Sequence, residues 1–387
     1  MGRCAIDRES PSGVIPPRRI PDGPSVPGSV PDEAPDEAPI KPADEPADDT
    51  VALSEGVAEA PPASESEVEE AAAWLGEIVA AVAKAVVGHD DAIRLAVACL
   101  LAGGHLLVED VPGVGKTTLA RALAASIGAQ WQRVQCTPDL LPTDLTGVHV
   151  PVGEPGATAR RVELRRGPLF AEVVMADELN RASPRTQAAL LEAMEERQIT
   201  LDGVTYPLPR PFFVVATQNP DDFEGTYPLP ESQLDRFLFR LHLGFPSVDA
   251  EMALLTQGGS TFGSRPESVV VQAVTVPAEL LRIAGIASRV YLAPALRRYL
   301  VELAGATRRE PRLHPGVSPR ALLGLAAAAR VWAAVHGRNY VLPDDLLELA
   351  EPTLAHRLGL GVIVDRGEVS ALLDEIVRAV PVPFPDR

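Results

Sequence analysis

The sequence has few cysteines and few aromatic residues, and both shortages limit what the protein can be. The three cysteines, Cys4, Cys99 and Cys136, lie far apart in a chain of 387 residues and show no CxxC spacing. We therefore expect neither a disulfide framework nor a zinc site, and a reducing cytoplasm is the environment that fits best. Because aromatic residues make up only 4% of the chain, Leu, Val, Ile and Ala must fill its core.

Basic residues and long apolar runs are also scarce. The formal net charge is -18 at pH 7, which argues against broad binding to nucleic acids or anionic membranes because both require a basic surface. The most apolar segment, residues 71–87, is interrupted by Glu77 and Lys84, so it lacks the roughly 18 uncharged residues of a membrane span. The first residues contain no apolar stretch typical of a signal peptide. We expect no nucleic-acid partner, no membrane insertion and a cytoplasmic location.

The first 66 residues differ in composition from the rest of the chain. They hold 13 of the 38 prolines, and their 14 acidic and five basic residues account for half of the net charge. Residues 31–39, PDEAPDEAP, repeat proline and acid. Such a segment buries too little apolar surface to offset the entropy cost of ordering, so residues 1–66 are predicted to form a disordered, acidic tail. A solvating role for this tail is favoured over a docking role.

The remainder of the chain divides into two predicted domains. Over residues 67–270, apolar strand segments alternate with helical segments, which predicts an α/β core with a parallel five-stranded sheet between helices. Beyond residue 271 only helical periodicity remains, so residues 271–387 are predicted to form a small all-α domain. The expected strands are 104–110, 131–136, 169–178, 211–219 and 236–243. The expected helices are 66–88, 91–103, 116–128, 183–198, 277–290, 294–308, 318–335, 343–358 and 369–380.

A glycine-containing loop, VPGVGKTT, lies between the first predicted strand and the helix that follows it. A loop before a helix N-terminus directs backbone N–H groups toward one point, where the helix dipole also favours an anion. The Lys116 ammonium can reach the β and γ phosphates of a nucleotide, and the Thr117 hydroxyl can bind Mg²⁺. The consensus GxxxxGK[ST] asks for glycine at position 110, where this sequence has Asp110. The predicted phosphate-binding residues are Val111, Pro112, Gly113, Val114, Gly115, Lys116, Thr117 and Thr118.

Polar side chains follow two further predicted strands. Asp177 and Glu178 end the strand VVMADE, and Asn219 ends the strand FFVVATQN. Open α/β sheets bind ligands at the carboxyl ends of their strands, so these side chains are expected near the phosphate loop. There Asp177 can hold Mg²⁺, Glu178 can orient and deprotonate a water, and Asn219 can bind that water or the γ-phosphate. The combination indicates nucleotide hydrolysis, although a carboxylate pair alone would not.

Over residues 80–385 the sequence resembles the AAA+ ATPases, and specifically the MoxR family. The resemblance rests on extended segments in the order that the family has them, including VEDVPGVGKTTLARALA, GPLFAEVVMADELNRASPRTQAALLEAMEERQIT, EGTYPLPESQLDRFLFR and SPRALLGLAAAAR. It implies a P-loop AAA+ core followed by a helical lid. It also implies ATP as the nucleotide, with Mg²⁺.

The resemblance implies further roles for particular residues. Arg236 of LDRF resembles an arginine finger that serves a neighbouring subunit, with Arg181 and Arg240 as nearby alternatives. Arg320 of SPRA resembles the second sensor and Asn219 the first. With Ser318 as N-cap and Pro319 at the first helical position, Arg320 is expected in the first turn of a lid helix. The adenine-contacting segment of the family is similar to residues around Val87 and Gly88, with His89 where glutamine is common.

For the whole protein, the resemblance implies a ring of six subunits that uses ATP hydrolysis to remodel or mature a client protein, with a partner bearing a von Willebrand A-type domain. DG and PG turn signals predict hairpins at 152–164 and 199–209, and in the family such insertions lie on the face or pore of the ring. One alternative is a scaffold that binds ATP and hydrolyses it slowly; Glu178 argues against it. A second alternative is a DNA-linked motor, which the acidic balance disfavours.

Overall fold

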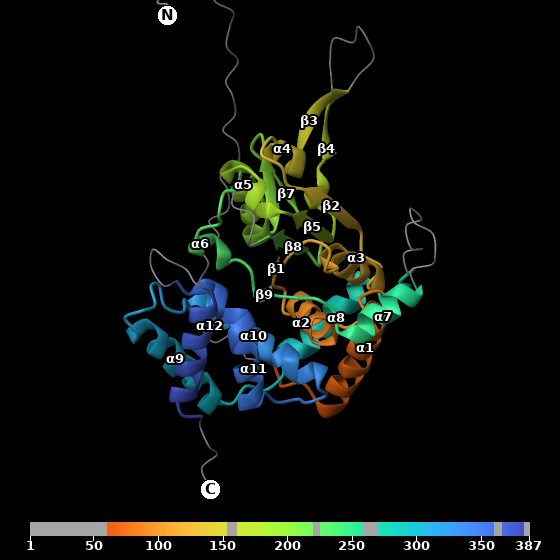
Figure 1. The fold of residues 1–387 in the computed structure, drawn as a ribbon. Coiled ribbons are helices and arrows are strands. Elements are labelled where there is room, and N and C mark those ends of the chain that lie inside the picture. The colour runs from red at the N-terminus through yellow and green to blue at the C-terminus, as the bar shows by residue number, and fades with distance from the viewer. Residues whose placement is uncertain (1–59, 153–160, 220–224, 258–269, 360–365, 383–387) are drawn as a thin grey trace, which may run out of the picture. The chain divides into compact units, whose positions relative to one another are not determined.

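The computed structural model describes residues 60–152, 161–219, 225–257, 270–359 and 366–382 (Figure 1). Most of the predicted tail and the tip of the first predicted hairpin lie outside these ranges. The first helix, α1 (Glu65–Ala83), begins at Ser64, whose hydroxyl accepts a hydrogen bond from the Glu67 N–H. None of the described helices is long and apolar enough to cross a membrane.

The predicted parallel five-stranded sheet is confirmed, in the order β2-β5-β8-β1-β9 with every neighbouring pair parallel. Its central strands are mostly apolar and buried on both faces, because alternate side chains point into two separate cores. In β5, Val173 and Met175 face one core, whereas Val174 and Ala176 face the other. The strands are β1 (Leu106–Glu109), β2 (Trp131–Gln135), β5 (Val173–Asp177), β8 (Phe213–Gln218) and β9 (Phe239–Leu241).

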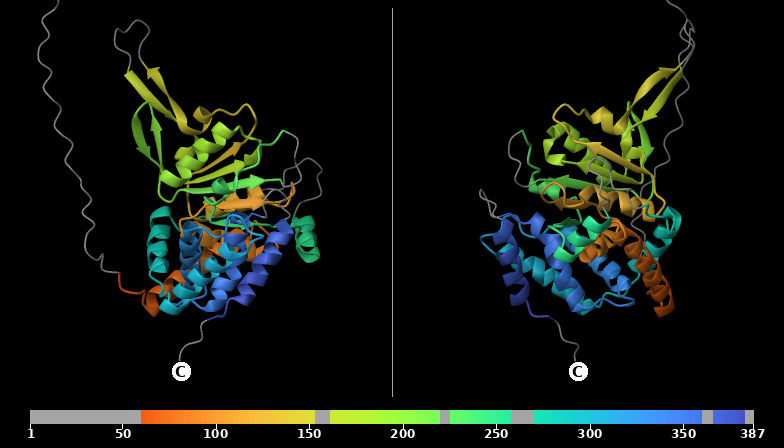
Figure 2. Two further views of the ribbon diagram at one scale, coloured as in Figure 1. Left: turned by 90° about the vertical axis from the view of Figure 1, so that its left-hand side faces the viewer. Right: turned by 45° about the vertical axis from the view of Figure 1, so that its right-hand side comes forward.

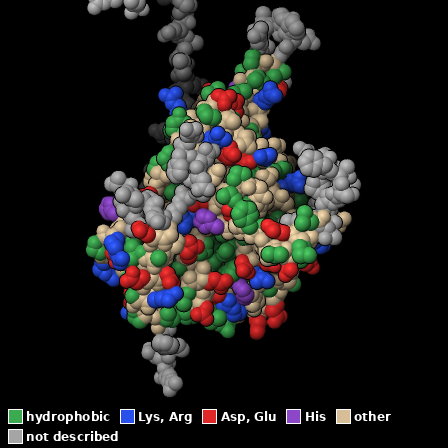
Figure 3. Space-filling model, in the orientation of Figure 1, with side chains coloured by type: hydrophobic (Ala, Val, Ile, Leu, Met, Phe, Trp, Pro, Cys, Tyr) green, Lys and Arg blue, Asp and Glu red, His purple; other side chains and the backbone are tan. Residues whose placement is uncertain are grey.

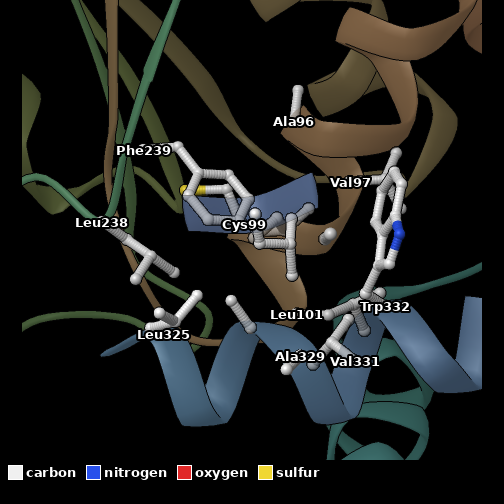
Figure 4. Close-up of a cluster of buried hydrophobic side chains, with 14 of the residues drawn as sticks. Ala96, Val97, Cys99, Leu101, Leu238, Phe239, Leu325, Ala329, Val331 and Trp332 are labelled. Carbon is white, nitrogen blue, oxygen red and sulfur yellow. The ribbon is translucent and has the colours of Figure 1, made fainter. Parts of the chain in front are cut away.

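Helices cover both faces of the sheet, as predicted (Figures 1 and 2). One face packs on α4 and α5, and the other on α2 and α3, while α1 and the helices α8 to α12 continue the same core and α11 also contacts β9. Figure 4 shows α2 and α10 meeting through apolar side chains that include Cys99, Leu325 and Trp332, beside Phe239 of the last strand. The described helices after α1 are α2 (Asp90–Leu101), α3 (Lys116–Ser126), α4 (Pro142–Thr146), α5 (Pro184–Glu196), α6 (Glu231–Leu234), α7 (Val248–Gln257), α8 (Pro277–Ser288), α9 (Pro294–Arg309), α10 (Pro319–Val335), α11 (Pro343–Leu354) and α12 (Arg366–Ala379).

All nine predicted helices are present, and the described residues after β9 contain helices without a further strand. The sequence reading missed α4, α6 and α7 and three short 3₁₀ turns, η1 (Pro168–Phe170), η2 (Leu179–Arg181) and η3 (Ala355–Arg357). All but α7 span one turn or little more, too short for an amphipathic period to show.

Two antiparallel hairpins extend beyond the sheet. The second lies at the predicted 199–209, whereas the first starts five residues before the predicted 152–164. They are β3 (Gly147–Val152) with β4 (Arg161–Arg166), and β6 (Gln198–Leu201) with β7 (Val204–Pro207). The His149 ring joins them, because its Nδ1 lies 2.6 Å from Asp202 Oδ2 and its Nε2 lies 3.0 Å from the Tyr206 hydroxyl. In each view of Figures 1 and 2 the β3–β4 hairpin projects away from the C-terminal helices.

Replacing Leu75 by Ala tests whether α1 is an integral part of the fold. Leu75 is fully buried in the core shared by α1, the sheet and the C-terminal helices, so we expect Leu75→Ala to lower the free energy of unfolding by about 2–5 kcal/mol. Chemical denaturation followed by circular dichroism measures this loss, with the exposed Glu77→Ala on the same helix as control. An unchanged midpoint for Leu75→Ala would mean that α1 contributes little to the folded state.

Candidate active site

The carboxyl ends of β1, β2, β5 and β8 surround an open pocket of about 380 Å³. The phosphate loop and the first turn of α3 form one wall, and polar side chains at the strand ends form the other. The pocket is lined by Pro112, Gly113, Gly115, Lys116, Thr117, Thr118, Arg133, Gln135, Asp177, Glu178 and Asn219. It therefore brings together all but two members of the predicted loop and the three polar residues predicted at the strand ends.

The loop takes a conformation that glycine alone adopts readily. Gly113 and Gly115 have φ values of 94° and 100°, in the region that side chains with a Cβ rarely occupy. A Cβ at either position would meet no heavy atom within 4 Å, so the space above the loop is open to a ligand. Because α3 starts at Lys116, the loop also places this ligand at a helix N-terminus, which favours phosphate.

Asp110 occupies the position of the missing consensus glycine and has a structural use. One carboxylate oxygen accepts a hydrogen bond from the Val111 N–H at 2.9 Å, and the other accepts from the Leu243 and Gly244 N–H groups, each at 2.7 Å. The backbone pairing of β1 with β9 ends at Val108 and Leu241. The Asp110 side chain thus continues this connection into the phosphate loop, where glycine has no side chain to do so.

Lys116 lies with its ammonium 2.6 Å from the Asp110 carbonyl oxygen, at the mouth of the loop. Burial lowers its pKa, an effect that the nearby carboxylates of Asp110, Asp177 and Glu178 oppose. An incoming polyphosphate adds negative charge beside this ammonium and favours its protonated form. The charge of Lys116 is therefore better compensated with a nucleotide in the pocket than without one.

Asp177 is nearly buried and is held from two sides. Its Oδ1 accepts a hydrogen bond from the Thr217 hydroxyl at 2.6 Å, and its Oδ2 pairs with the Arg133 guanidinium at 2.5 Å. Arg133 projects from β2, the edge strand next to β5. Its positive charge compensates the nearly buried Asp177 carboxylate.

Glu178 adopts a strained backbone conformation just after β5. Its φ of 56° is in the left-handed region, which is uncommon for a residue other than glycine and costs of order 1–3 kcal/mol. The Thr217 hydroxyl accepts a hydrogen bond from the Glu178 N–H at 2.9 Å and so helps to fix the turn. The Glu178 Oε2 accepts hydrogen bonds from the Gln135 amide and the Arg181 guanidinium, each at 3.1 Å. The turn directs the carboxylate into the pocket instead of along the strand.

The predicted adenine segment, Val87 and Gly88, does not line the phosphate pocket. Gly88 has a φ of 83° and packs so closely on α7 that a Cβ there would lie 2.7 Å from the Ala250 Cβ. His89 is buried at the start of α2, and its Nε2 has no hydrogen-bond partner among the described residues. Val87 and Gly88 line neither the phosphate pocket nor the hollow that shares Thr118 with it. Their role stays a prediction.

The two predicted regulatory arginines, Arg236 and Arg320, lie together and not in the phosphate pocket. Both guanidinium groups pair with Glu195 near the end of α5, the Arg236 Nη2 at 3.1 Å from its Oε2. The Arg320 guanidinium lowers the pKa of the Glu195 carboxyl. Ser318 caps α10 by accepting a hydrogen bond from the Ala321 N–H, which confirms the predicted helix start and puts Arg320 in its first turn.

The two alternative finger residues are engaged elsewhere. Arg181 pairs with Glu178 of the same site, as described above. Arg240 is buried on β9 and pairs with Glu109 and Glu351, so it links the sheet to α11. Its burial inside its own chain argues against contact with a neighbour.

The sequence reading missed Thr217, Arg133, Gln135 and Glu195. A signal for Arg133 and Gln135 was present, because these polar residues alternate with Val134 at the carboxyl end of a predicted strand. Thr217 was hidden inside an apolar run, and Glu195 looks like any acidic residue on an exposed helix face.

Comparison with known proteins agrees with this geometry. Residues 105–239 match the model of the ATPase family associated with various cellular activities (AAA), and residues 305–376 match that of the AAA lid domain. The chain is 45% identical over 311 residues to the uncharacterized protein YeaC of Bacillus subtilis, covering 80% of this chain and 95% of that protein. It is 38% identical over 336 residues to the chaperone MoxR1 of Mycobacterium tuberculosis, covering 84% and 86%. The chain belongs to the MoxR family of AAA+ ATPases.

A solved structure supports the same assignment for this MoxR-family ATPase. The crystal structure of a candidate ATPase from Cytophaga hutchinsonii superposes with a TM-score of 0.73 at 33% identity, covering 83% of this chain and 98% of that one. The family assignment therefore makes this protein an ATPase.

Restoring the consensus glycine is expected to harm this site. Asp110→Gly removes the carboxylate that binds three N–H groups, so we expect a loss of about 1–3 kcal/mol in the free energy of unfolding and weaker ATP binding. Asp110→Asn keeps one acceptor oxygen and should lose less. Denaturant titration and fluorescent-nucleotide binding measure both effects. A glycine variant as stable as the wild type would show that the carboxylate contacts contribute nothing.

Proposed function

We propose that this protein hydrolyses ATP with Mg²⁺ in a ring and uses the energy to remodel a client protein. The observation that carries the proposal is the convergence of Lys116, Asp177, Glu178 and Asn219 around one pocket beside a phosphate loop. The loop would bind the phosphates, and the remaining side chains match the needs of phosphoryl transfer to water.

The residues present fit a magnesium ion. The described residues contain no cluster of three or more His, Cys, Asp or Glu side chains, and Mg²⁺ in ATPase sites needs only one or two protein ligands because phosphates and waters supply the rest. Thr117 and Asp177 would hold the ion. A bound Mg²⁺ would supply positive charge that offsets the negative charge of the phosphates. Arg133 would then exchange its contact with Asp177 for one with the phosphates.

Glu178 is the proposed general base. In the described part of the chain both of its side-chain hydrogen bonds involve Oε2, so the lone pairs of Oε1 are open to a water molecule. The carboxylate would take a proton from that water as the water oxygen attacks the γ-phosphorus, while the bond between the γ-phosphorus and the bridging oxygen breaks and ADP leaves. Asn219, on the neighbouring strand end, would hold the water or the phosphate in line.

Arg236 is proposed to act on the nucleotide of a neighbouring subunit. Arg320, which the resemblance implies as the second sensor of the lid, lies beside it, so we extend the proposal to Arg320 as well. Neither residue lines the phosphate pocket of its own subunit, yet both lie in one partly exposed cluster held by Glu195. A neighbour's γ-phosphate would replace the Glu195 carboxylate as their anionic partner. Hydrolysis then requires assembly, for which a six-membered ring is the proposed form.

The client is proposed to bind at the hairpins. They carry exposed apolar side chains, Val148, Val152 and Val162 on the first and Val204 on the second, which suit contact with another polypeptide. A chaperone-like role is supported by the similarity to the chaperone MoxR1. A partner with a von Willebrand A-type domain, a cytoplasmic location, and the division into a core over 67–270 and a lid over 271–387 belong to the same proposal. On the face shown in Figure 3, acidic and basic side chains are interspersed, which does not favour a nucleic-acid role.

Glu178→Gln separates hydrolysis from binding. Because the amide cannot accept the proton of water, we expect ATP turnover to fall by about 10²–10⁴-fold while ATP affinity is retained. Steady-state phosphate release and nucleotide titration measure the two quantities, and Glu302→Gln on α9 serves as a surface control. A wild type without turnover, even with its partner present, would favour the scaffold alternative.

Mixing two inactive chains tests the shared site. Arg236→Ala keeps a working pocket but lacks the finger, whereas Lys116→Ala keeps the finger but lacks a working pocket. We expect partial recovery of ATP turnover when the two variants co-assemble, because each supplies what the other lacks. No recovery in assemblies whose mixed composition is verified by native mass spectrometry would count against a site shared between subunits.

A further inference from the structure

The chain segment that carries Arg236 is bound by lid residues on both sides of the arginine. On its C-terminal side, the Phe237 carbonyl oxygen accepts two hydrogen bonds, from the His356 Nε2 at 2.9 Å and from the Arg357 Nη2 at 2.7 Å. Both donors belong to η3, at the end of α11. One backbone carbonyl next to the proposed finger thus receives two side chains of the lid.

On the N-terminal side, the Asp235 carboxylate meets the lid twice. It accepts a hydrogen bond from the Ser318 hydroxyl, at 3.2 and 3.3 Å from its two oxygens, and its Oδ1 lies 3.5 Å from the Arg357 Nε. Ser318 is also the cap of α10, the helix that carries Arg320. Arg236 and Arg320, the arginines proposed to act on a neighbour's nucleotide, are therefore connected through Glu195. They are also connected through Asp235 and Ser318.

These contacts are made at a considerable electrostatic cost. Arg357 is 6% exposed and His356 is 4% exposed, and burial lowers the pKa of both, that of Arg357 to about 10. The Arg357 Nη1 and the His356 Nδ1 have no hydrogen-bond partner among the described residues. A buried guanidinium with one unmatched nitrogen is less favourable than an apolar side chain of the same volume, so packing alone does not account for it.

The helix α10 also makes room for this arrangement. Gly324 lies in its interior, where glycine costs about 1 kcal/mol relative to alanine. A Cβ at this position would lie 2.9 Å from the Leu238 Cδ1 and 3.6 Å from the Arg357 Nη1. The missing side chain lets Arg357 and Leu238 approach the helix.

We propose that His356 and Arg357 are positioning residues for the arginine finger, which clamp the segment 235–237 to the lid of the same subunit. The inference rests on the proposed role of Arg236 in a neighbour's site. Neither residue touches the nucleotide; both act by fixing the backbone from which Arg236 extends. A displacement of the lid in one subunit would then move the finger that this subunit offers to the next, so the state of one site is passed on around the ring.

The test uses the mixed assemblies described above, with the Arg236→Ala chain as acceptor. The donor chain carries Lys116→Ala alone, or together with Arg357→Met, which removes the guanidinium but keeps an unbranched apolar side chain. We expect the Arg357→Met donor to restore at least about tenfold less turnover than the simple donor, because misplacing a catalytic group by an ångström costs up to about 10²-fold. Arg312→Met in the donor is the matched control, since Arg312 is an exposed lid residue that pairs with Glu310.

A second pair of donors covers the case in which Arg357→Met does not fold or assemble. His356→Gln can still donate an amide N–H to the Phe237 carbonyl, whereas His356→Leu cannot. We expect the glutamine donor to restore more turnover than the leucine donor. Each His356 substitution is also placed in the acceptor chain, together with Arg236→Ala, and mixed with the simple Lys116→Ala donor. The KM and turnover of this mixture should stay near those of the Arg236→Ala acceptor with the same donor.

The outcomes separate the two levels of the proposal. If the simple donor restores no turnover, the shared site is wrong and the clamp falls with it. If the simple donor works and folded, co-assembled Arg357→Met and His356→Leu donors work equally well, the shared site stands and the clamp is overturned. If these variants lose turnover as acceptors to the same degree as donors, they perturb the whole fold and the positioning role is likewise overturned.

Discussion

The parallel pairing of β5 with β8 is the interaction on which the catalytic arrangement depends. It places Thr217 beside Asp177 and Glu178, so that one hydroxyl donates to the first carboxylate and accepts from the backbone of the second residue. The left-handed turn at Glu178 is supported by this bond, and the turn directs the carboxylate into the pocket. Parallel strands leave their carboxyl ends at one edge, so the phosphate loop after β1 meets the same side chains.

Arginines balance the acidic residues of this edge in two different places. Arg133 and Arg181 neutralise the carboxylates inside the pocket, where a metal ion and phosphates would change their partners. Arg236 and Arg320 lie outside this pocket, where both pair with Glu195. The net charge of -18 therefore says little about the site itself, because local pairing and not overall balance sets its field.

Much of this arrangement follows from the sequence, since apolar strand runs and a phosphate loop have strong local signals. The five strands, nine helices and two hairpins were predictable because each has a period or a turn signal of its own. Thr217, Glu195 and Arg357 were not, because their importance comes from partners 40 to 125 residues away in the chain, such as Glu195 with Arg320. The adjacency of Arg236 and Arg320 is likewise a property of tertiary packing: each was identified as important, but their shared carboxylate has no signature in either motif.

The carboxylate of Asp110 gives the phosphate loop a second attachment. In a loop with glycine at this position, shape is governed by the strand before it and the helix after it. Here the loop is also tethered to residues 243 and 244, where the chain leaves β9 on its way to α7. A shift of this exit segment would therefore act on the Asp110 carboxylate at the start of the phosphate loop. Asp110 in place of the consensus glycine thus couples the phosphate loop to residues 243 and 244. A motif search that scores only the glycines would count Asp110 as a defect.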